Sequence, residues 1–130
     1  MGVANTTDYV TIATAGDATD FGDLTDARYV GGAASNSTRG LFAGGLDPSN
    51  SNIVDYITIA STGNATDFGD LTAAGQTGSG AASSVRALFH VAAAAAIDYF
   101  TIASTGDATD FGDMTQNCAN VSGMSNGTRG

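Results

Sequence analysis

The hydrophobic and polar residues of this chain follow one phrase that occurs three times, beginning at Asp8, Asp55 and Asp98. In each copy a run of Tyr, Thr and branched apolar residues leads into a Gly-containing turn, and an Asp-Phe-Gly-Asp run follows. Apolar residues on both faces of the first run are typical of a β-strand that is covered on two sides. In the first copy we predict a strand over residues 9–13, a turn, and a shorter strand over 18–25 in which Gly allows a β-bulge. The two strands together predict a β-hairpin.

Two further strands are predicted after each hairpin. Residues 29–35 are mostly small, which fits a strand in a tight space such as near a central axis. Residues 39–45 form the next predicted strand, and a polar loop over 46–52 leads back to the next copy. In the second period alanines at 92–96 replace this loop, and we expect a shortened connection because isolated helices this short are unstable in water. Each period therefore predicts four short strands, the number in one blade of a β-propeller.

The phrase recurs at spacings of 47 and 43 residues (55 − 8 and 98 − 55), and Arg39, Arg86 and Arg129 recur at the same spacings. Repeats of this length indicate a propeller, a solenoid or another array. We predict a single repeat domain over residues 1–130. Its predicted periods are residues 8–54, 55–97, and 98–130 together with 1–7.

The third period shows no equivalent of the strand at 39–45. Residues 1–4 are apolar enough to form one strand, and we expect this strand to complete the last period. The strand would come from the other end of the same chain or from another copy, and its pairing would remove an exposed sheet edge. Exchange between copies produces a closed ring or an endless fibre, so we predict a homo-oligomer or a filament.

The composition supports an all-β chain and narrows its partners. All thirteen acidic residues are Asp, Glu and Lys are missing, and Gly is abundant, so strands and tight turns are favoured over helices. The formal net charge of −9 argues against a nucleic-acid or anionic-membrane partner. No apolar run approaches membrane-spanning length, and the first residues lack the pattern of a signal peptide. The single cysteine, Cys118, excludes a disulfide within the chain.

Gly44-Gly45 ends one predicted strand, Tyr56 lies in the next, and Phe68 stands before Leu71 and a turn. This order of residues resembles a kelch-type propeller blade, with Phe at the usual place of the kelch Trp, although the second period lacks the glycine pair. The phrase that begins at Asp55 is also similar to repeat proteins of aquatic phages and uncultured microbes. This resemblance covers nearly the whole chain. It implies an adsorption fibre or a surface structure, in a virion or outside the cell, and it carries no catalytic residue.

Recurring aspartates are the best candidates for ion binding. Hard cations such as calcium take oxygen ligands, and carboxylates three residues apart around a turn could converge on one. The alternative is turn chemistry, in which Asx side chains accept hydrogen bonds from local backbone amides and keep strand edges soluble. The spacing is not that of an EF-hand, and we favour the turn role. The aspartates, which are joined in the second copy by Asn64, are Asp17, Asp20, Asp23, Asp67, Asp70, Asp107, Asp110 and Asp113.

Arginine and aromatic side chains that recur in phase are predicted to be structural. A guanidinium at each Arg position would bridge strand carbonyls or pair with an Asp such as Asp55, and the alternative is a ring of Arg that faces a sugar carboxylate. The Tyr rings are expected to pack between blades. The predicted structural residues are Arg39, Arg86, Arg129, Tyr9, Tyr56, Tyr99, Phe21, Phe68 and Phe111.

The sequence does not present the groups of an enzyme. His90 is the single histidine, so a packed or surface role is favoured over catalysis. The Asp-Phe-Gly runs spell a kinase motif, but the chain has no Lys and no catalytic loop to accompany them. We therefore expect no cofactor. The predicted function is a structural or adhesive repeat protein that assembles with itself, and the alternative is a lectin-like module that binds carbohydrate.

Overall fold

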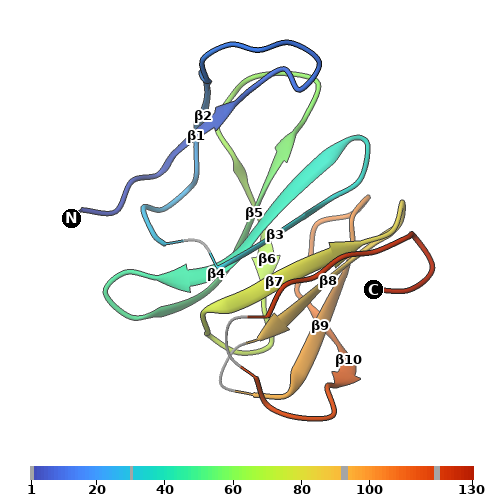
Figure 1. Ribbon diagram of the computed structural model, residues 1–130. Coiled ribbons are helices and arrows are strands. Elements are labelled where there is room, and N and C mark those ends of the chain that lie inside the picture. The colour runs from blue at the N-terminus through green and yellow to red at the C-terminus, as the bar shows by residue number, and fades with distance from the viewer. Residues whose placement is uncertain (1, 30, 92–93, 119–120) are drawn as a thin grey trace.

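The computed structural model describes residues 2–29, 31–91, 94–118 and 121–130, and the fold is all-β, as predicted (Figure 1). The described residues contain no helix and form only antiparallel strand pairs. The strands are β1 (Thr6–Tyr9), β2 (Thr19–Asp23), β3 (Gly32–Ser35), β4 (Arg39–Leu46), β5 (Asn50–Thr58), β6 (Thr66–Asp70), β7 (Thr77–Ala82), β8 (Arg86–Val91), β9 (Ala96–Thr101) and β10 (Thr109–Asp113).

The strands form three sheets that follow the repeats of the sequence. Strands β1 and β2 form a hairpin that we call module 1. Strands β3 to β6 form a four-stranded sheet in sequence order, module 2, and strands β7 to β10 form a second one, module 3. The predicted number of four short strands is therefore confirmed in both complete modules. Each module combines the last two strands of one predicted period with the hairpin of the next, so the sheets are out of phase with the predicted periods 8–54 and 55–97.

Each hairpin carries a β-bulge at the same place, as predicted from its glycine. In module 2 Val54 pairs with Gly69 and Asp55 pairs with Asp67, so Phe68 is the extra residue on β6. The same shift occurs in the other two hairpins, where Phe21 is the extra residue on β2 and Phe111 is the extra residue on β10. A bulge bends its strand and redirects the side chain of the extra residue.

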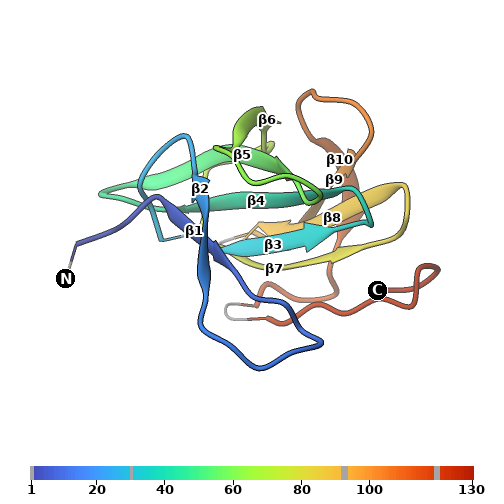
Figure 2. The same ribbon diagram turned by 90° about the horizontal axis from the view of Figure 1, so that it is seen from above.

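The strands made of small residues lie in a tight space, as predicted. Strand β3 lies beside β7, where modules 2 and 3 meet (Figure 2). A Cβ atom added at Gly32 would come within 3.1 Å of the Thr77 hydroxyl oxygen and 3.3 Å of the Phe89 ring. On its other side β7 contacts the C-terminal segment, because an added Cβ at Gly78 would lie 3.0 Å from the Val121 side chain. A side chain at either glycine would force its neighbours to shift, so residues without side chains suit this place.

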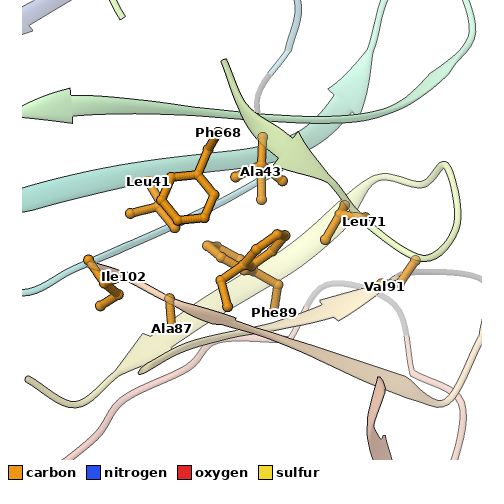
Figure 3. Close-up of a cluster of buried hydrophobic side chains, with 10 residues drawn as sticks. Leu41, Ala43, Phe68, Leu71, Ala87, Phe89, Val91 and Ile102 are labelled. Carbon is orange, nitrogen blue, oxygen red and sulfur yellow. The ribbon is translucent and has the colours of Figure 1, made fainter. Parts of the chain in front are cut away.

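The hydrophobic core lies between modules 2 and 3 (Figure 3). The rings of Phe68 and Phe100 meet edge to face with centroids 5.5 Å apart, and Phe89 meets Phe100 in the same way at 6.0 Å. Each fully buried Phe side chain stabilises the fold by about 1.5–3 kcal/mol relative to an exposed one. Both modules contribute to the cluster of Leu41, Ala43, Val54, Phe68, Leu71, Ala87, Phe89, Val91, Phe100 and Ile102.

The first predicted strand, over residues 9–13, is wrong in its position. Strand β1 ends at Tyr9, and Val10 and Ile12 are exposed instead of covered on two faces. The corresponding strand β5 continues to Thr58 because it pairs with β4 as far as Arg39. Strand β1 pairs only with β2 among the described residues, so nothing supports its continuation.

The strand predicted over residues 1–4 is also wrong, since residues 2–4 lie outside any strand and Met1 lies outside the described residues. By the repeat spacing these residues correspond to 48–51 and lead into the hairpin, as the bond from the Leu24 N–H to the Asn5 carbonyl shows (2.7 Å). The two ends of the described chain lie on opposite sides of the molecule (Figure 1). The structure therefore does not pair them within one chain.

Other predicted bounds need smaller corrections. Strand β3 begins at Gly32, not at residue 29, and Tyr29 forms an isolated bridge with Leu46 while Val30 lies outside the described residues. The predicted loop at 46–52 shrinks to 47–49 because β4 and β5 extend into it. Of the predicted connection at 92–96, residues 92–93 lie outside the described residues and Ala96 begins β9.

Candidate functional site

The most repeated feature of the structure is the contact between one hairpin and the next module. The Gly63 N–H donates to the Phe21 carbonyl oxygen and the Ala65 N–H to the Asp23 carbonyl oxygen, both at 2.7 Å. The Asp23 N–H in turn donates to the Asn64 side-chain oxygen at 3.1 Å. Strand β2 of module 1 is thereby joined to the loop before β6 of module 2 by three hydrogen bonds.

Modules 2 and 3 repeat this contact with equivalent residues. The Gly106 N–H donates to the Phe68 carbonyl oxygen at 2.7 Å, and the Ala108 N–H donates to the Asp70 carbonyl oxygen at 2.8 Å. The Asp70 N–H donates to an Asp107 carboxylate oxygen at 3.2 Å. Because the same backbone hydrogen bonds recur with the sequence phrase, the repeat itself specifies the contact between neighbouring modules.

Glycine is required at the centre of each contact. Gly22 and Gly69 have φ angles of 145° and 146°, which favour glycine. A Cβ at Gly69 would overlap the Gly106 carbonyl group, and a Cβ at Gly22 would overlap that of Gly63. The Asp-Phe-Gly-Asp run is thus explained by packing: Phe fills the space between modules and Gly lets the next loop approach.

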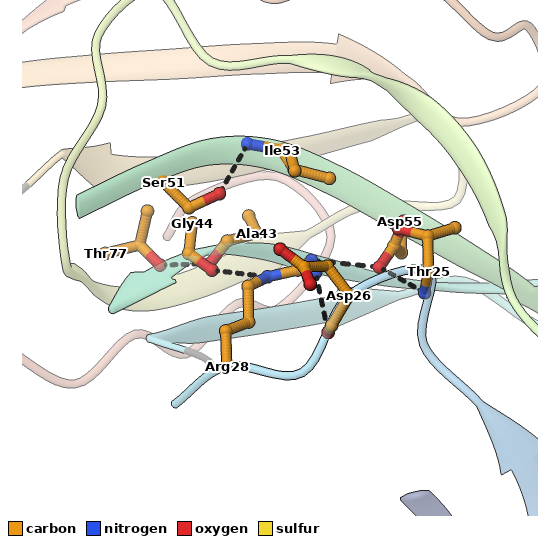
Figure 4. A network of polar contacts seen from close by, with 9 residues as sticks. All are labelled: Thr25, Asp26, Arg28, Ala43, Gly44, Ser51, Ile53, Asp55 and Thr77. Carbon is orange, nitrogen blue, oxygen red and sulfur yellow. Dashed lines mark hydrogen bonds and ion pairs between the residues drawn. The ribbon is translucent and has the colours of Figure 1, made fainter. Parts of the chain in front are cut away.

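A buried aspartate secures each contact from the side. Asp55 is fully buried and accepts hydrogen bonds from the Thr25 hydroxyl at 2.6 Å and from the Thr25 N–H at 3.2 Å (Figure 4). Its other partner is Arg28, whose Nη2 lies 3.0 Å from Asp55 Oδ2 and whose Nε donates to the Gly44 carbonyl oxygen at 3.0 Å. A buried carboxylate is tolerated when it is paired and hydrogen-bonded in this way.

Asp98 occupies the equivalent place between modules 2 and 3. It is also fully buried, and it accepts from the Thr72 N–H at 2.8 Å and from the Thr72 hydroxyl at 2.8 and 2.9 Å. The sequence positions of Arg28 in the next two periods are Gly75 (28 + 47) and Cys118 (75 + 43), so this ion pair does not recur. The recurring unit is therefore the Asp–Thr pair.

Of the phased arginines, Arg39 makes a contact of the predicted kind. The Arg39 guanidinium stacks on Tyr56, 4.6 Å from the ring centroid, and Nη1 donates to the Ile102 carbonyl oxygen of module 3 at 2.8 Å. Arg86 stacks on Tyr99 at 4.8 Å. The backbone of Arg129 forms the same turn as that of Arg39, with the Asn126 side-chain oxygen 2.9 Å from its N–H. Arg39 thus bridges modules through a carbonyl, which is one of its two predicted roles.

Each recurring Tyr packs on the Phe of its own hairpin, with ring centroids 5.7 to 6.0 Å apart in an edge-to-face arrangement. The ring contact that crosses from one module to the next is that of Phe68 with Phe100. The tyrosines were predicted to pack between modules, but in the described ring contacts they pack within their own hairpin, and phenylalanine makes the contact between modules. The three Tyr–Phe pairs are Tyr9–Phe21, Tyr56–Phe68 and Tyr99–Phe111.

The recurring aspartates do not gather into an ion site. Within the described ranges, no three His, Cys, Asp or Glu side chains converge on a point where a metal ion could be held. Two of the candidate positions instead accept backbone hydrogen bonds across a module contact, Asn64 from Asp23 and Asp107 from Asp70. Asp110 caps the Gly112 N–H of its own turn at 3.1 Å. These contacts match the turn chemistry that the sequence favoured.

His90 and Cys118 are the single imidazole and the single thiol of the sequence. His90 is buried in β8 and its Nε2 lies 3.1 Å from the Ala94 carbonyl oxygen, while Nδ1 has no partner in the described structure. Cys118 is a half-buried free thiol.

A pocket of about 140 Å³ lies in the β9–β10 hairpin and is lined by residues from Tyr99 to Thr109. Pockets that hold small ligands are typically about 300–1,000 Å³, so this one is small for a ligand.

Sequence reasoning missed the buried Asp–Thr pairs and the ion pair. A signal for the pairs was present, because Asp55 and Asp98 stand in phase between apolar residues, and Thr25 and Thr72 end each phrase. The missing information was that the Thr of one period contacts the Asp of the next. Arg28 gave no such signal because it has no counterpart in the other periods.

Comparison with known proteins leaves the site to be interpreted from its geometry. In the ranges that the structure describes, no helix combines the length and the apolar character needed to cross a membrane. A scan against protein-family models gave no match, and a search of curated proteins also gave none.

Proposed function

We propose that this chain is a non-enzymatic structural or adhesive repeat protein, a self-assembling subunit of a virion fibre or an extracellular filament. Its architecture would be a kelch-like β-propeller of about three four-stranded blades, in which a blade is completed between copies. The C-terminal segment at 121–130 would supply the inner part of that blade, since it lies against β7 on the side opposite β3. The hairpin β1–β2 of the next copy would supply the outer part.

The observation that carries this proposal is the module contact that the chain makes twice with equivalent atoms. Each contact joins two backbone hydrogen bonds, an Asx acceptor, a buried Asp that accepts from a Thr, and a packed Phe. In repeat proteins each unit contacts only its neighbours, so such a surface can continue from one copy to the next. A surface that adds identical units is what a fibre or a ring requires.

The use of the buried polar side chains supports a structural role. Asp55 and Asp98 accept hydrogen bonds from a threonine of the preceding period. Arg28 pairs with the Asp55 carboxylate and also donates to the Gly44 carbonyl oxygen. The buried Thr77 hydroxyl donates to the Ala43 carbonyl oxygen at 2.5 Å and so ties β7 to β4. These groups hold modules together instead of facing a cavity where a substrate could bind.

Carbohydrate binding is the second candidate function. The observation that favours it is the pocket in the β9–β10 hairpin, where Tyr99 offers a ring and Ser104, Thr105 and Thr109 offer hydroxyl groups. Its volume of about 140 Å³ would accommodate no more than part of one sugar ring. Asp107 on its rim already accepts the Asp70 N–H. We therefore place the structural role first.

Two measurements test this order of proposals. Analytical ultracentrifugation and negative-stain images should show oligomers, rings or fibres whose amount grows with protein concentration. A glycan array should give no signal above background for the structural role, and a specific signal would favour the lectin-like role. A protein that stays monomeric at every accessible concentration would refute self-assembly.

A further inference from the structure

Strand β10 has the shape of β2 and β6, but in the described structure no neighbouring loop covers it. Phe21 and Phe68 are 7% and 2% exposed, whereas Phe111 is 52% exposed. Gly112 has a φ of 137°, like its two counterparts, and a Cβ added there would meet no atom within 4 Å. No residue of another loop in the described ranges donates to the carbonyl oxygens of Phe111 or Asp113.

The complementary surface lies at the other end of the molecule, on the loop between β1 and β2. Its Gly16-Asp17-Ala18 sequence corresponds to Gly63-Asn64-Ala65 and Gly106-Asp107-Ala108, which bind β2 and β6. The same loop contains Ile12, which is 97% exposed, whereas the equivalent Ile102 is fully buried against module 2. Module 1 thus presents the loop face of a module contact, and no hairpin of the described residues packs against it.

The two polar elements of the contact are also present as separate halves. Asp8 is exposed, whereas its counterparts Asp55 and Asp98 are buried. Thr115 bonds no carboxylate in the described structure, whereas its counterparts Thr25 and Thr72 each bond one. The third element is an arginine. Arg86 is exposed and stacked on Tyr99, in the geometry from which Arg39 reaches the carbonyl of the next module.

We propose that the β10 face of one copy (Arg86, Phe111–Thr115) binds the module 1 loop face of a second copy (Asp8, residues 10–18), head to tail. This inference rests on the proposed function and specifies the surface that would perform it. By the repeat, the Gly16 and Ala18 N–H groups of the second copy donate to the carbonyl oxygens of Phe111 and Asp113. Thr115 bonds Asp8 of the second copy, and Arg86 bonds its Ile12 carbonyl oxygen.

A second copy is the partner that the structure favours because the proposed interface continues one that the chain already makes twice. The two halves carry the same sequence phrase as the halves that do meet, and on the β10 face Gly112 shares the positive φ of Gly22 and Gly69. The two faces are different patches, so the contact is heterologous. Such a contact closes into a ring or extends into a fibre, according to the rotation between successive copies.

The test uses one substitution on each face of the 130-residue chain. Gly112→Ala places a methyl group where the second copy's Gly16 carbonyl would lie, and Ile12→Asp places a charge at the centre of the loop face. Ultracentrifugation is run at about 0.15 M salt, because the net charge of −9 on each copy must be screened. Each single variant should weaken association by roughly tenfold or more, which corresponds to about 1.4 kcal/mol.

Mixing the two variants provides the decisive measurement. Each variant retains the face that the other has lost, so the mixture should form a 1:1 dimer and nothing larger. The double variant should associate with neither itself nor the wild-type chain more tightly than background. Far-UV circular dichroism checks the fold, and Thr115→Val replaces Gly112→Ala in every measurement if the strained glycine position prevents folding.

The outcomes separate this inference from the proposed function. If wild-type chains assemble but Gly112→Ala or Thr115→Val assembles equally well, the head-to-tail contact is refuted while self-assembly stands. A mixture of two folded single variants that remains monomeric refutes it as well. Wild-type chains that never assemble refute both proposals.

Discussion

Removal of one hydroxyl group at a module contact should destabilise the fold measurably. Thr72→Val keeps the volume and branching of the side chain and removes the hydrogen bond that its hydroxyl donates to Asp98. The Thr72 hydroxyl oxygen lies 2.8 and 2.9 Å from the two carboxylate oxygens, and Asp98 is fully buried. One donor would remain, the Thr72 N–H at 2.8 Å from the carboxylate. Water cannot reach the fully buried carboxylate without opening the contact.

The magnitude follows from the charge and the burial of the acceptor. A hydrogen bond to a charged group contributes about 1.5–3 kcal/mol, and we expect a loss of about 2 kcal/mol in the free energy of unfolding. For a chain of this size that loss lowers the Tm by roughly 6–10 °C. Urea denaturation followed by circular dichroism, at a concentration where the chain is monomeric, measures it.

The sequence repeat supplies a matched control. Thr115→Val makes the same change in the third copy of the phrase. Thr72 and Thr115 are both exposed, but only Thr72 bonds a carboxylate in the described structure. The effect of Thr115→Val on monomer stability should stay within about 0.5 kcal/mol. Equal losses for the two variants, or no loss for Thr72→Val, would refute the reasoning that the Asp–Thr pair holds modules together.

Three further substitutions probe other parts of the module contact. Arg28→Ala leaves its buried carboxylate partner unpaired and should cost about 3–5 kcal/mol in urea denaturation. Phe68→Ala should cost about 3–5 kcal/mol because the ring is buried between modules, whereas Phe111→Ala should cost about 1 kcal/mol since half of that ring is exposed. Gly69→Ala should lower the Tm more than Gly112→Ala does: both positions share a strained φ, and only the first would clash with the next module.

The hairpin and the four-strand period could be predicted because they depend on short-range patterns. A run of Tyr, Thr and branched apolar residues, a Gly-containing turn and the Asp-Phe-Gly-Asp run indicate β5 and β6 within the phrase that begins at Asp55. The bulge at Phe68 follows from the glycine beside it. Strand ends were predicted less well, because the length of β5 depends on its pairing with β4 and not on its own residues.

The polar part of the site could not be predicted because it joins residues that are far apart in sequence. Thr25 and Asp55 are separated by 30 residues, and Thr72 and Asp98 by 26. Nothing in the local pattern shows that a carboxylate in a strand is buried, since burial is decided by the module that covers it. Arg28 was missed for a related reason: it compensates one particular buried charge and therefore has no periodicity.

The three copies of the phrase show how neighbours, and not local sequence, determine the environment of a residue. The isoleucine of the phrase is 97% exposed at Ile12, 44% at Ile59 and fully buried at Ile102, while the exposure of its phenylalanine is highest in the last copy. The exposure of the isoleucine falls along the chain because the preceding module covers more of each successive loop face. The phenylalanine is most exposed in the last copy because no following loop of the described residues covers it. In a one-dimensional array, stability is the sum of the stabilities of the units and of the contacts between them. An additional contact between copies would therefore stabilise the outermost modules most, and these are the modules that carry the two exposed faces.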